Sequence, residues 1–337
     1  MERKSTFKKI TTSLIAVCLM TIASTAIGQN SADKEPTFPG YDIRGFVQQQ
    51  FFYDEMPGVP AQFTMYRARV GVDGALAERI RVNVTGGFVE PPQNTPRLVQ
   101  AFMDYRVNNY ITLRAGQFLI PFGLEGPEVI TLNPAIERSL AIRRLNTFSL
   151  FRDVGVQAGG NISRFNYAIA IVNGTGGNQP EQMNPKDITG RFGFQLSENF
   201  EAGISGHFGN YYPNQEDESY ESRYRLGIDL NFTGDPFFVR GEYIQRTDNL
   251  PNSSEIKMYG GYLLAGYSLS QRLEGITRYE FYKPNSDLDD NLLQAYTIGA
   301  NYYFVRRTRL SVNYEFRNNE LNPDFGNLFT VQLQVVL

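Results

Sequence analysis

The stretch RTRLSVNYEF, residues 307–316, decides the fold, because its side chains alternate between two chemical kinds. One set is mostly apolar and comprises Thr308, Leu310, Val312, Tyr314 and Phe316. The intervening set is polar or charged and comprises Arg307, Arg309, Ser311, Asn313 and Glu315. Successive side chains of a strand point to opposite faces, so this segment has one face suited to hydrocarbon and one suited to water. That pattern is typical of a transmembrane β-barrel.

The same alternation recurs along the chain and continues to Leu337, which predicts about sixteen strands. They cover residues 41–52, 63–76, 80–89, 98–107, 110–119, 153–162, 165–173, 187–196, 200–211, 220–232, 236–246, 256–269, 273–282, 292–304, 308–317 and 328–337. The connections alternate between short ones and long polar ones. A soluble β-sandwich is the alternative, but faces such as Leu226, Ile228 and Leu230 are too apolar for contact with water. We predict an all-β protein, a transmembrane antiparallel β-barrel over residues 41–337.

The first residues have the features of a secretory signal. Basic residues at the start are followed by an apolar stretch and then by small residues up to Gly28. We expect residues 1–28 to be a signal peptide, residues 29–40 a short periplasmic segment, and the barrel to reach the bacterial outer membrane through the periplasm. The one cysteine, Cys18, lies in the signal, so the exported chain is predicted to contain no disulfide and no cysteine metal site.

The composition excludes several classes of function. After Gly28 there are 28 basic and 34 acidic side chains, and this mild acidity argues against a nucleic-acid partner. No phosphate-binding loop, cluster of metal ligands or cofactor motif is present. His207 is the one histidine and has no catalytic motif around it. We therefore expect no enzyme activity, no catalytic residue, no metal and no cofactor.

Many of the predicted lumen positions carry arginine, which outnumbers lysine 24 to 4 after Gly28. The guanidinium group is always charged and matches the geometry of phosphate and carboxylate, and rings of such charges select anions in pores. The main lumen candidates are Arg67, Arg69, Arg114, Arg191, Arg223, Arg225, Arg240, Arg278, Arg307 and Arg309. Acidic residues share the same face, so the alternative is that these arginines form ion pairs that brace the wall.

The longest connection, Pro121 to Phe151, mixes apolar residues with glutamates and arginines. An ordered loop of this length needs a surface on which to pack, and the barrel interior is available. Packing over the rim of the barrel is the alternative.

Several segments in order resemble the phosphate-selective porin O and P family of outer-membrane proteins. They read YRARVGVDGAL (66–76), LRAGQFLIPFGLEG (113–126), IERSL (136–140), FRDVGVQAGG (151–160), FNYAIAIVNGTGGN (165–178) and KDITGRFGFQL (186–196). The resemblance implies a sixteen-stranded barrel that forms a homotrimer, with an inward-folded third outer loop and an arginine ladder for anions. It places Glu137, Arg138, Arg143 and Arg144 on this constriction loop.

Two features depart from the family pattern. The mature chain has no cluster of lysines, and the last residue, Leu337, is not aromatic. The expected function is a porin that lets small solutes diffuse passively, with a preference for small anions such as phosphate. A non-selective porin and a sealed barrel with a structural or surface-binding role are the alternatives.

Overall fold

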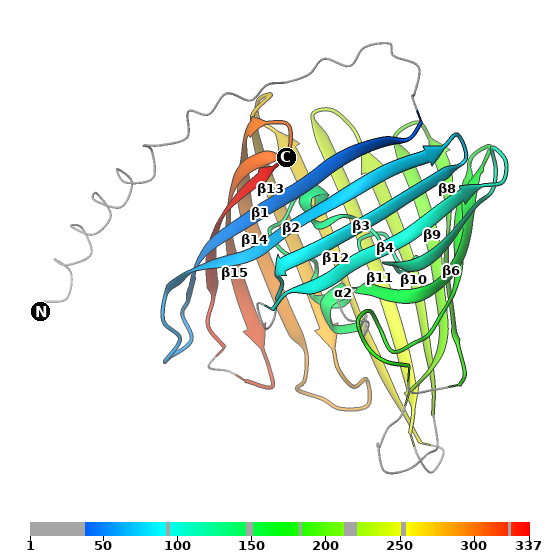
Figure 1. Ribbon diagram of the computed structural model, residues 1–337. Coiled ribbons are helices and arrows are strands. Elements are labelled where there is room, and N and C mark those ends of the chain that lie inside the picture. Colours follow the sequence, from blue (N-terminus) through cyan, green and yellow to red (C-terminus); the bar gives the residue numbers. More distant parts are fainter. Residues whose placement is uncertain are drawn as a thin grey trace, which may run out of the picture. The chain divides into compact units, whose positions relative to one another are not determined.

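The computed structural model describes residues 38–91, 95–145, 151–181, 184–211, 221–250, 254–322 and 325–337. The predicted signal peptide therefore lies outside the described residues. Sixteen antiparallel strands follow one another around a closed barrel (Figure 1). They are β1 (Gly40–Asp54), β2 (Gln62–Ala77), β3 (Ile80–Val89), β4 (Arg97–Arg106), β5 (Thr112–Leu119), β6 (Arg152–Ile162), β7 (Phe165–Val172), β8 (Asp187–Ser197), β9 (Phe200–Tyr211), β10 (Glu221–Thr233), β11 (Phe237–Asn249), β12 (Glu255–Ser268), β13 (Leu273–Lys283), β14 (Leu293–Val305), β15 (Thr308–Asn319) and β16 (Leu328–Val336).

The barrel closes where β1 pairs with β16, the first strand with the last. Gln48 lies opposite Gln334, and its side-chain Nε2 donates a hydrogen bond to Gln334 Oε1 at 2.7 Å. The backbone N–H of Leu337 donates to the carbonyl oxygen of Gly45 at 2.9 Å. Closure leaves no strand edge, so the backbone groups of every strand are paired with a neighbour, as a spanning sheet in hydrocarbon requires.

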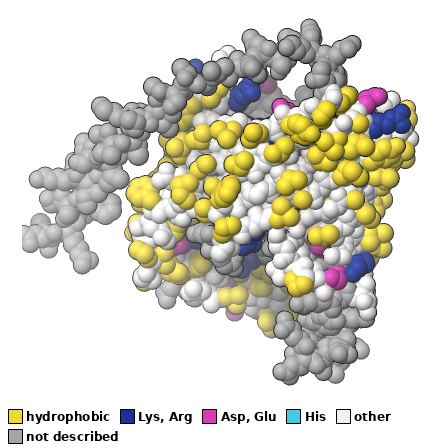
Figure 2. Space-filling model, in the orientation of Figure 1, with side chains coloured by type: hydrophobic (Ala, Val, Ile, Leu, Met, Phe, Trp, Pro, Cys, Tyr) yellow, Lys and Arg dark blue, Asp and Glu magenta, His cyan; other side chains and the backbone are white. Residues whose placement is uncertain are grey.

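The outer face of the barrel is apolar. On β10, Leu226 and Ile228 are 61% and 60% exposed, while the adjacent lumen-facing Asp229 is 3% exposed. Figure 2 shows apolar side chains spread over the visible outer face, with charged side chains mostly near its upper and lower edges. The predicted barrel fold and the predicted alternation are therefore confirmed. No helix among the described residues is long and apolar enough to cross a membrane.

The short turns lie at one end of the barrel together with the start of β1 and the end of β16, and the long connections lie at the other (Figure 1). The turn between β4 and β5 is stabilised by Asn108, whose Oδ1 accepts hydrogen bonds from the backbone N–H groups of Tyr110 and Ile111 at 2.8 and 2.9 Å. Asparagine favours turns because its side chain can satisfy backbone donors nearby in this way.

The predicted strand limits agree closely with the structure, and the largest difference is at β11. This strand ends at Asn249 instead of the predicted Arg246. The extra residues include Asp248, whose carboxylate accepts hydrogen bonds from Arg223 and Arg246 on the lumen face. The last residues of the strand are polar on both faces, so the alternation that marks a strand in the sequence is lost before the pairing ends.

Candidate functional site

The connection between β5 and β6 folds into the barrel, so the predicted inward fold is confirmed. It contains a short 3₁₀ helix, η1 (Ile130–Leu132), and a short α-helix, α2 (Leu140–Leu145), which Figure 1 shows among the strands. One apolar cluster joins this loop to β11 and β12 and consists of Ile120, Phe122, Ala141, Ile142, Leu145, Ile244 and Met258. A second joins Ala135 to Tyr262, Leu264 and Ile276. Full burial of one large apolar side chain contributes about 1.5–3 kcal/mol, so these clusters hold the loop against the wall.

Buried carboxylates and the hydroxyl of Ser205 on the wall accept hydrogen bonds from the loop backbone. The N–H groups of Leu124 and Glu125 donate to the carboxylate of Glu242 on β11 at 3.2 and 3.3 Å. The N–H of Leu140 donates to Glu280 Oε2 on β13 at 2.8 Å. Gly123, with φ +76°, lies so close that a Cβ there would collide with the Glu242 carboxylate. Glycine is therefore required at this position, because it fits both the left-handed backbone and the close approach.

The loop also accepts hydrogen bonds from arginine side chains on the wall. Arg278 Nη1 donates to the carbonyl of Glu137 at 2.7 Å, and Arg309 Nη2 to that of Asn133 at 2.5 Å. Arg240 forms an ion pair with the Glu128 carboxylate at 3.0 Å. These three arginines were predicted to face the lumen, and each lies beneath the loop, between 1% and 8% exposed. The loop thus occupies at least one terminal guanidinium nitrogen of each arginine, while the Nε of each forms no hydrogen bond with the described residues.

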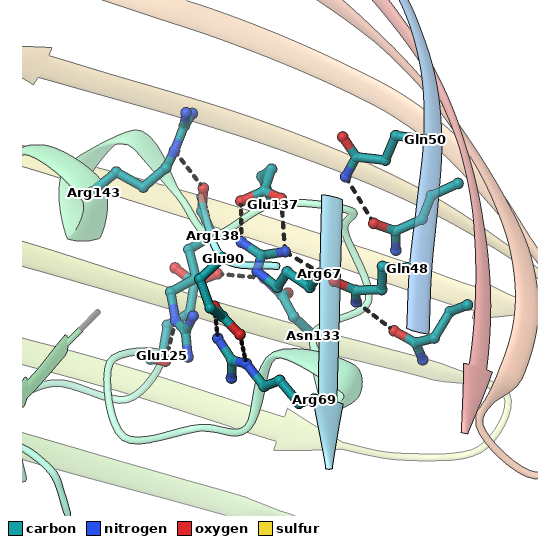
Figure 3. A network of polar contacts seen from close by, with 12 residues as sticks. Gln48, Gln50, Arg67, Arg69, Glu90, Glu125, Asn133, Glu137, Arg138 and Arg143 are labelled. Carbon is teal, nitrogen blue, oxygen red and sulfur yellow. Dashed lines mark hydrogen bonds and ion pairs between the residues drawn. The ribbon is translucent and has the colours of Figure 1, made fainter. Parts of the chain in front are cut away.

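Arg67 and Arg69 on β2 meet carboxylates from two different connections (Figure 3). Arg67 Nη1 and Nη2 donate to Glu137 Oε1 and Oε2 at 3.1 and 3.2 Å. Arg69 Nε and Nη2 donate to the carboxylate of Glu90 at 2.5 and 2.7 Å. Burial alone would raise the pKa of the Glu137 carboxyl, but the guanidinium groups of Arg67, Arg143 and Arg138 together outweigh burial and hold that pKa below its ordinary value. Glu137 is therefore a carboxylate at neutral pH.

The three arginines predicted on the constriction loop occupy two kinds of environment. Arg138 is 7% exposed and donates to the backbone carbonyls of Glu125, at 3.2 Å, and of Glu128. Arg143 and Arg144 lie on α2 and are exposed. Arg143 Nε donates to the Arg138 carbonyl at 2.9 Å (Figure 3). Within the part of the chain that the structure describes, neither Arg143 nor Arg144 forms an ion pair with a carboxylate.

The remaining predicted lumen arginines lie around the rest of the wall. Arg114 forms a two-point contact with Asp104 at 2.7 and 2.9 Å, and Arg191 contacts Asp229 and Glu201. Arg223 donates to Asp248 at 2.9 Å, and Arg225 is 1% exposed. Arg307 is exposed at the short turn after β14.

His207 is fully buried opposite Arg225 in the register, with Nε2 3.2 Å from Asp187 Oδ2. No group of three or more histidine, cysteine or acidic residues suited to a metal ion occurs among the described residues.

Besides Asp248 on β11, two further buried charges at strand ends were not predicted from the sequence. Glu90 directly follows β3 and is 0% exposed, and Arg152 begins β6 and is 5% exposed. Both residues lie where the alternation of their strand stops, so no pattern in the sequence indicates the side on which they lie.

Two cavities, each of about 670 Å³, remain beside the loop at the end of the barrel with the short turns. The first, here called the amide chamber, lies between β4–β8 and the start of the loop, and its lining includes Thr112, Arg114, Gln157, Asn161, Leu119 and Val129. The second, the basic chamber, lies along β1–β4 and β16, and its lining includes Arg44, Arg69, Arg152, Arg306 and Arg307. They share Gln100, Phe102 and Val129. The open space of these two chambers thus borders the β1–β8 wall and, at the basic chamber, also the turn after β14 and the end of β16.

Solved outer-membrane proteins share this fold. The loop-deletion form of OmpT from Vibrio cholerae superposes with a TM-score of 0.70 at 12% identity, covering 89% of this chain and 100% of that one. The channel DcaP of Acinetobacter baumannii gives 0.69 at 14% identity, covering 90% and 99%. An anion-selective porin from Comamonas acidovorans gives 0.66 at 13% identity, covering 89% and 100%. At these identities the likeness shows the fold alone. No curated protein matches the sequence.

The sequence itself matches a family profile over residues 70–330, described as "Putative beta-barrel porin-2, OmpL-like". The match agrees with the predicted resemblance at the level of outer-membrane porins, which are typically channels without enzyme activity, and it does not extend to the phosphate-selective group. The chain therefore belongs to the OmpL-like beta-barrel porin-2 family and is an outer-membrane, porin-like channel for passive diffusion.

Proposed function

We propose that this channel prefers small anions, such as phosphate or carboxylates, and that Arg143 and Arg144 on α2 set the preference. The observation that carries the proposal is the exposure of these two guanidinium groups without a carboxylate partner among the described residues. By contrast, the wall arginines Arg114, Arg191 and Arg223 form ion pairs with neighbouring acids. An unbalanced charge in a narrow passage of low dielectric acts more strongly on a permeating ion than it would in open water.

The reversal potential in a planar bilayer with a salt gradient tests the proposal. We expect its sign to show anion preference in the wild type, and we expect the double variant Arg143→Gln and Arg144→Gln to shift it towards zero. The matched control is Arg164→Gln with Arg272→Gln, because both residues are exposed in short turns. A wild-type reversal potential near zero would favour the non-selective porin, and a silent barrel would favour a sealed, structural role.

We also infer that residues 1–28 direct export, and that the mature chain assembles as a homotrimer in outer-membrane lipid. One structurally similar protein, OmpT of Vibrio cholerae, is described in a trimer form. Chemical cross-linking of intact outer membranes, followed by electrophoresis, tests the trimer. Mass analysis of the exported protein tests cleavage after Gly28.

A further inference from the structure

The amide chamber differs in charge from the basic chamber beside it. The Arg114 guanidinium is held by both oxygens of Asp104 and stacks over the Phe102 ring, with its carbon 3.9 Å from the ring centre. Arg191 meets two carboxylates, Asp229 at 2.9 Å and Glu201 at 2.7 Å. Each arginine in the lining is thus neutralised by its own neighbours, so the chamber offers an anion no excess positive charge.

The polar groups left over in the amide chamber are neutral. Thr112, Gln157 and Asn161 line it, and their side chains form no hydrogen bond with the described residues. A carboxamide and a hydroxyl each supply both a donor and an acceptor, which matches the hydroxyl groups of a solute. The lining also includes the apolar residues Leu119, at the end of β5, and Pro127 and Val129 on the loop. The chamber therefore combines neutral polar groups with apolar side chains.

From this lining we infer that the amide chamber is a separate passage site for uncharged solutes that carry hydroxyl groups on a carbon frame, of which monosaccharides are the simplest. Its volume of about 670 Å³ lies within the range of small-molecule sites, about 300–1,000 Å³. The inference rests on the proposed function, because it assumes an open channel. Anions would instead pass through the basic chamber, whose lining includes Arg306 and Arg307, which form no ion pair with the described residues, beside the paired Arg69.

Ala168 gives a way to fill the amide chamber alone. It lies on β7 within the lining, and it is absent from the lining of the basic chamber. The variant Ala168→Phe would add a ring to the chamber while leaving every charged residue in place. The matched control is Ala202→Phe on β9, because Ala202 shares the outer face with the exposed Ile204. A second variant, Gln157→Leu with Asn161→Leu, removes the neutral polar groups without filling the space.

The experiment compares glucose uptake, from the swelling of vesicles that contain the full-length barrel, with the reversal potential of the same protein. Folding of each variant is verified by heat-modifiable migration on gels. We expect Ala168→Phe and the double leucine variant to lower glucose uptake severalfold without moving the reversal potential, and Ala202→Phe to change neither. Unchanged uptake in folded Ala168→Phe would overturn this inference and leave the proposed anion preference intact. A parallel change in uptake and reversal potential would show one common passage and would also overturn it. A silent wild type in both assays would overturn the proposed function as well.

Discussion

Arg67 on β2 and Glu137 on the inward loop form a two-point contact across the lumen, with N–O distances of 3.1 and 3.2 Å. The Glu137 backbone carbonyl also accepts a hydrogen bond from Arg278 on β13 at 2.7 Å. One loop residue is therefore held from two sides of the barrel, by strands far apart in the ring. The loop is fixed as a bridge across the lumen, which explains how a segment with little regular structure keeps one position.

We expect Glu137→Gln to loosen this bridge and to increase the fluctuations of single-channel current at neutral pH. The pKa of the Glu137 carboxyl is held below its ordinary value, so the contact contributes stability above a pH of about 4.3, and this contribution is lost as the pH falls through the lower pKa of the folded state. The difference between the wild type and Glu137→Gln should therefore shrink below that pH. Current recordings across a pH series check this, and a difference that persists at low pH would contradict it.

Deleting residues 126–146 should raise the single-channel conductance while the barrel still folds. The strand ladder does not depend on the loop, because each strand pairs with its neighbours in the wall. The variant loses the apolar cluster around Ile142 and Leu145, so we also expect it to unfold at a lower temperature. Conductance and heat-modifiable migration are the measurements. An unchanged conductance would mean that ions do not pass the loop.

Substituting arginine for Leu226 should destabilise the barrel by about 2–4 kcal/mol if the residue lies near the bilayer midplane, because the charge would face hydrocarbon. Leu226 is 61% exposed on the outer face of β10. The volume-conserving Leu226→Met is the control and should cost less than about 1.5 kcal/mol. Folding titrations in lipid vesicles measure both costs. An equal cost for the two variants would place Leu226 away from lipid.

The wall could be predicted from the sequence, because the side chains of a barrel strand alternate between apolar ones that face lipid and polar ones that face the lumen. Leu310 and Arg309 illustrate this, since one is exposed to the outside and the other points inwards. The interior could not be predicted in the same way. The alternation places Asn313 on the watery face, which predicts that Asn313→Arg has almost no effect on stability. In the structure, however, Asn313 is 1% exposed and its amide lies against the backbone of Ile136 in the loop.

The same limit applies to the arginines. The alternation gives the side of the wall on which an arginine lies, but whether its charge is free depends on groups from distant segments. The Arg309 guanidinium donates a hydrogen bond to the carbonyl of Asn133, which is 176 residues away in the chain. Arg143 and Arg138 lie on the same loop, but Arg143 on α2 is exposed whereas Arg138, which precedes α2, is buried. These differences arise from tertiary packing of an irregular loop, which has no periodic signal.

The last prediction concerns Arg278, which we expect to stabilise the barrel. It is 1% exposed and donates both to the Glu137 carbonyl and to the carboxylate of Glu280, at 2.7 and 3.2 Å. Replacing it with methionine keeps much of the volume but leaves the buried Glu280 carboxylate without its cation. Removing one partner of a buried ion pair costs about 3–5 kcal/mol, because the remaining charge is uncompensated.

Denaturant unfolding of Arg278→Met in lipid vesicles measures this cost. Arg272→Gln is the control, because Arg272 is exposed in the turn before β13 and a surface substitution there should change stability by less than about 0.5 kcal/mol. Since Arg278 is covered by the loop, the reversal potential of the folded fraction should stay close to that of the wild type. A shifted potential with unchanged stability would show that Arg278 acts on permeating ions. The assignment of Arg278 to holding the loop, and of Arg143 and Arg144 to ion selectivity, would then be wrong.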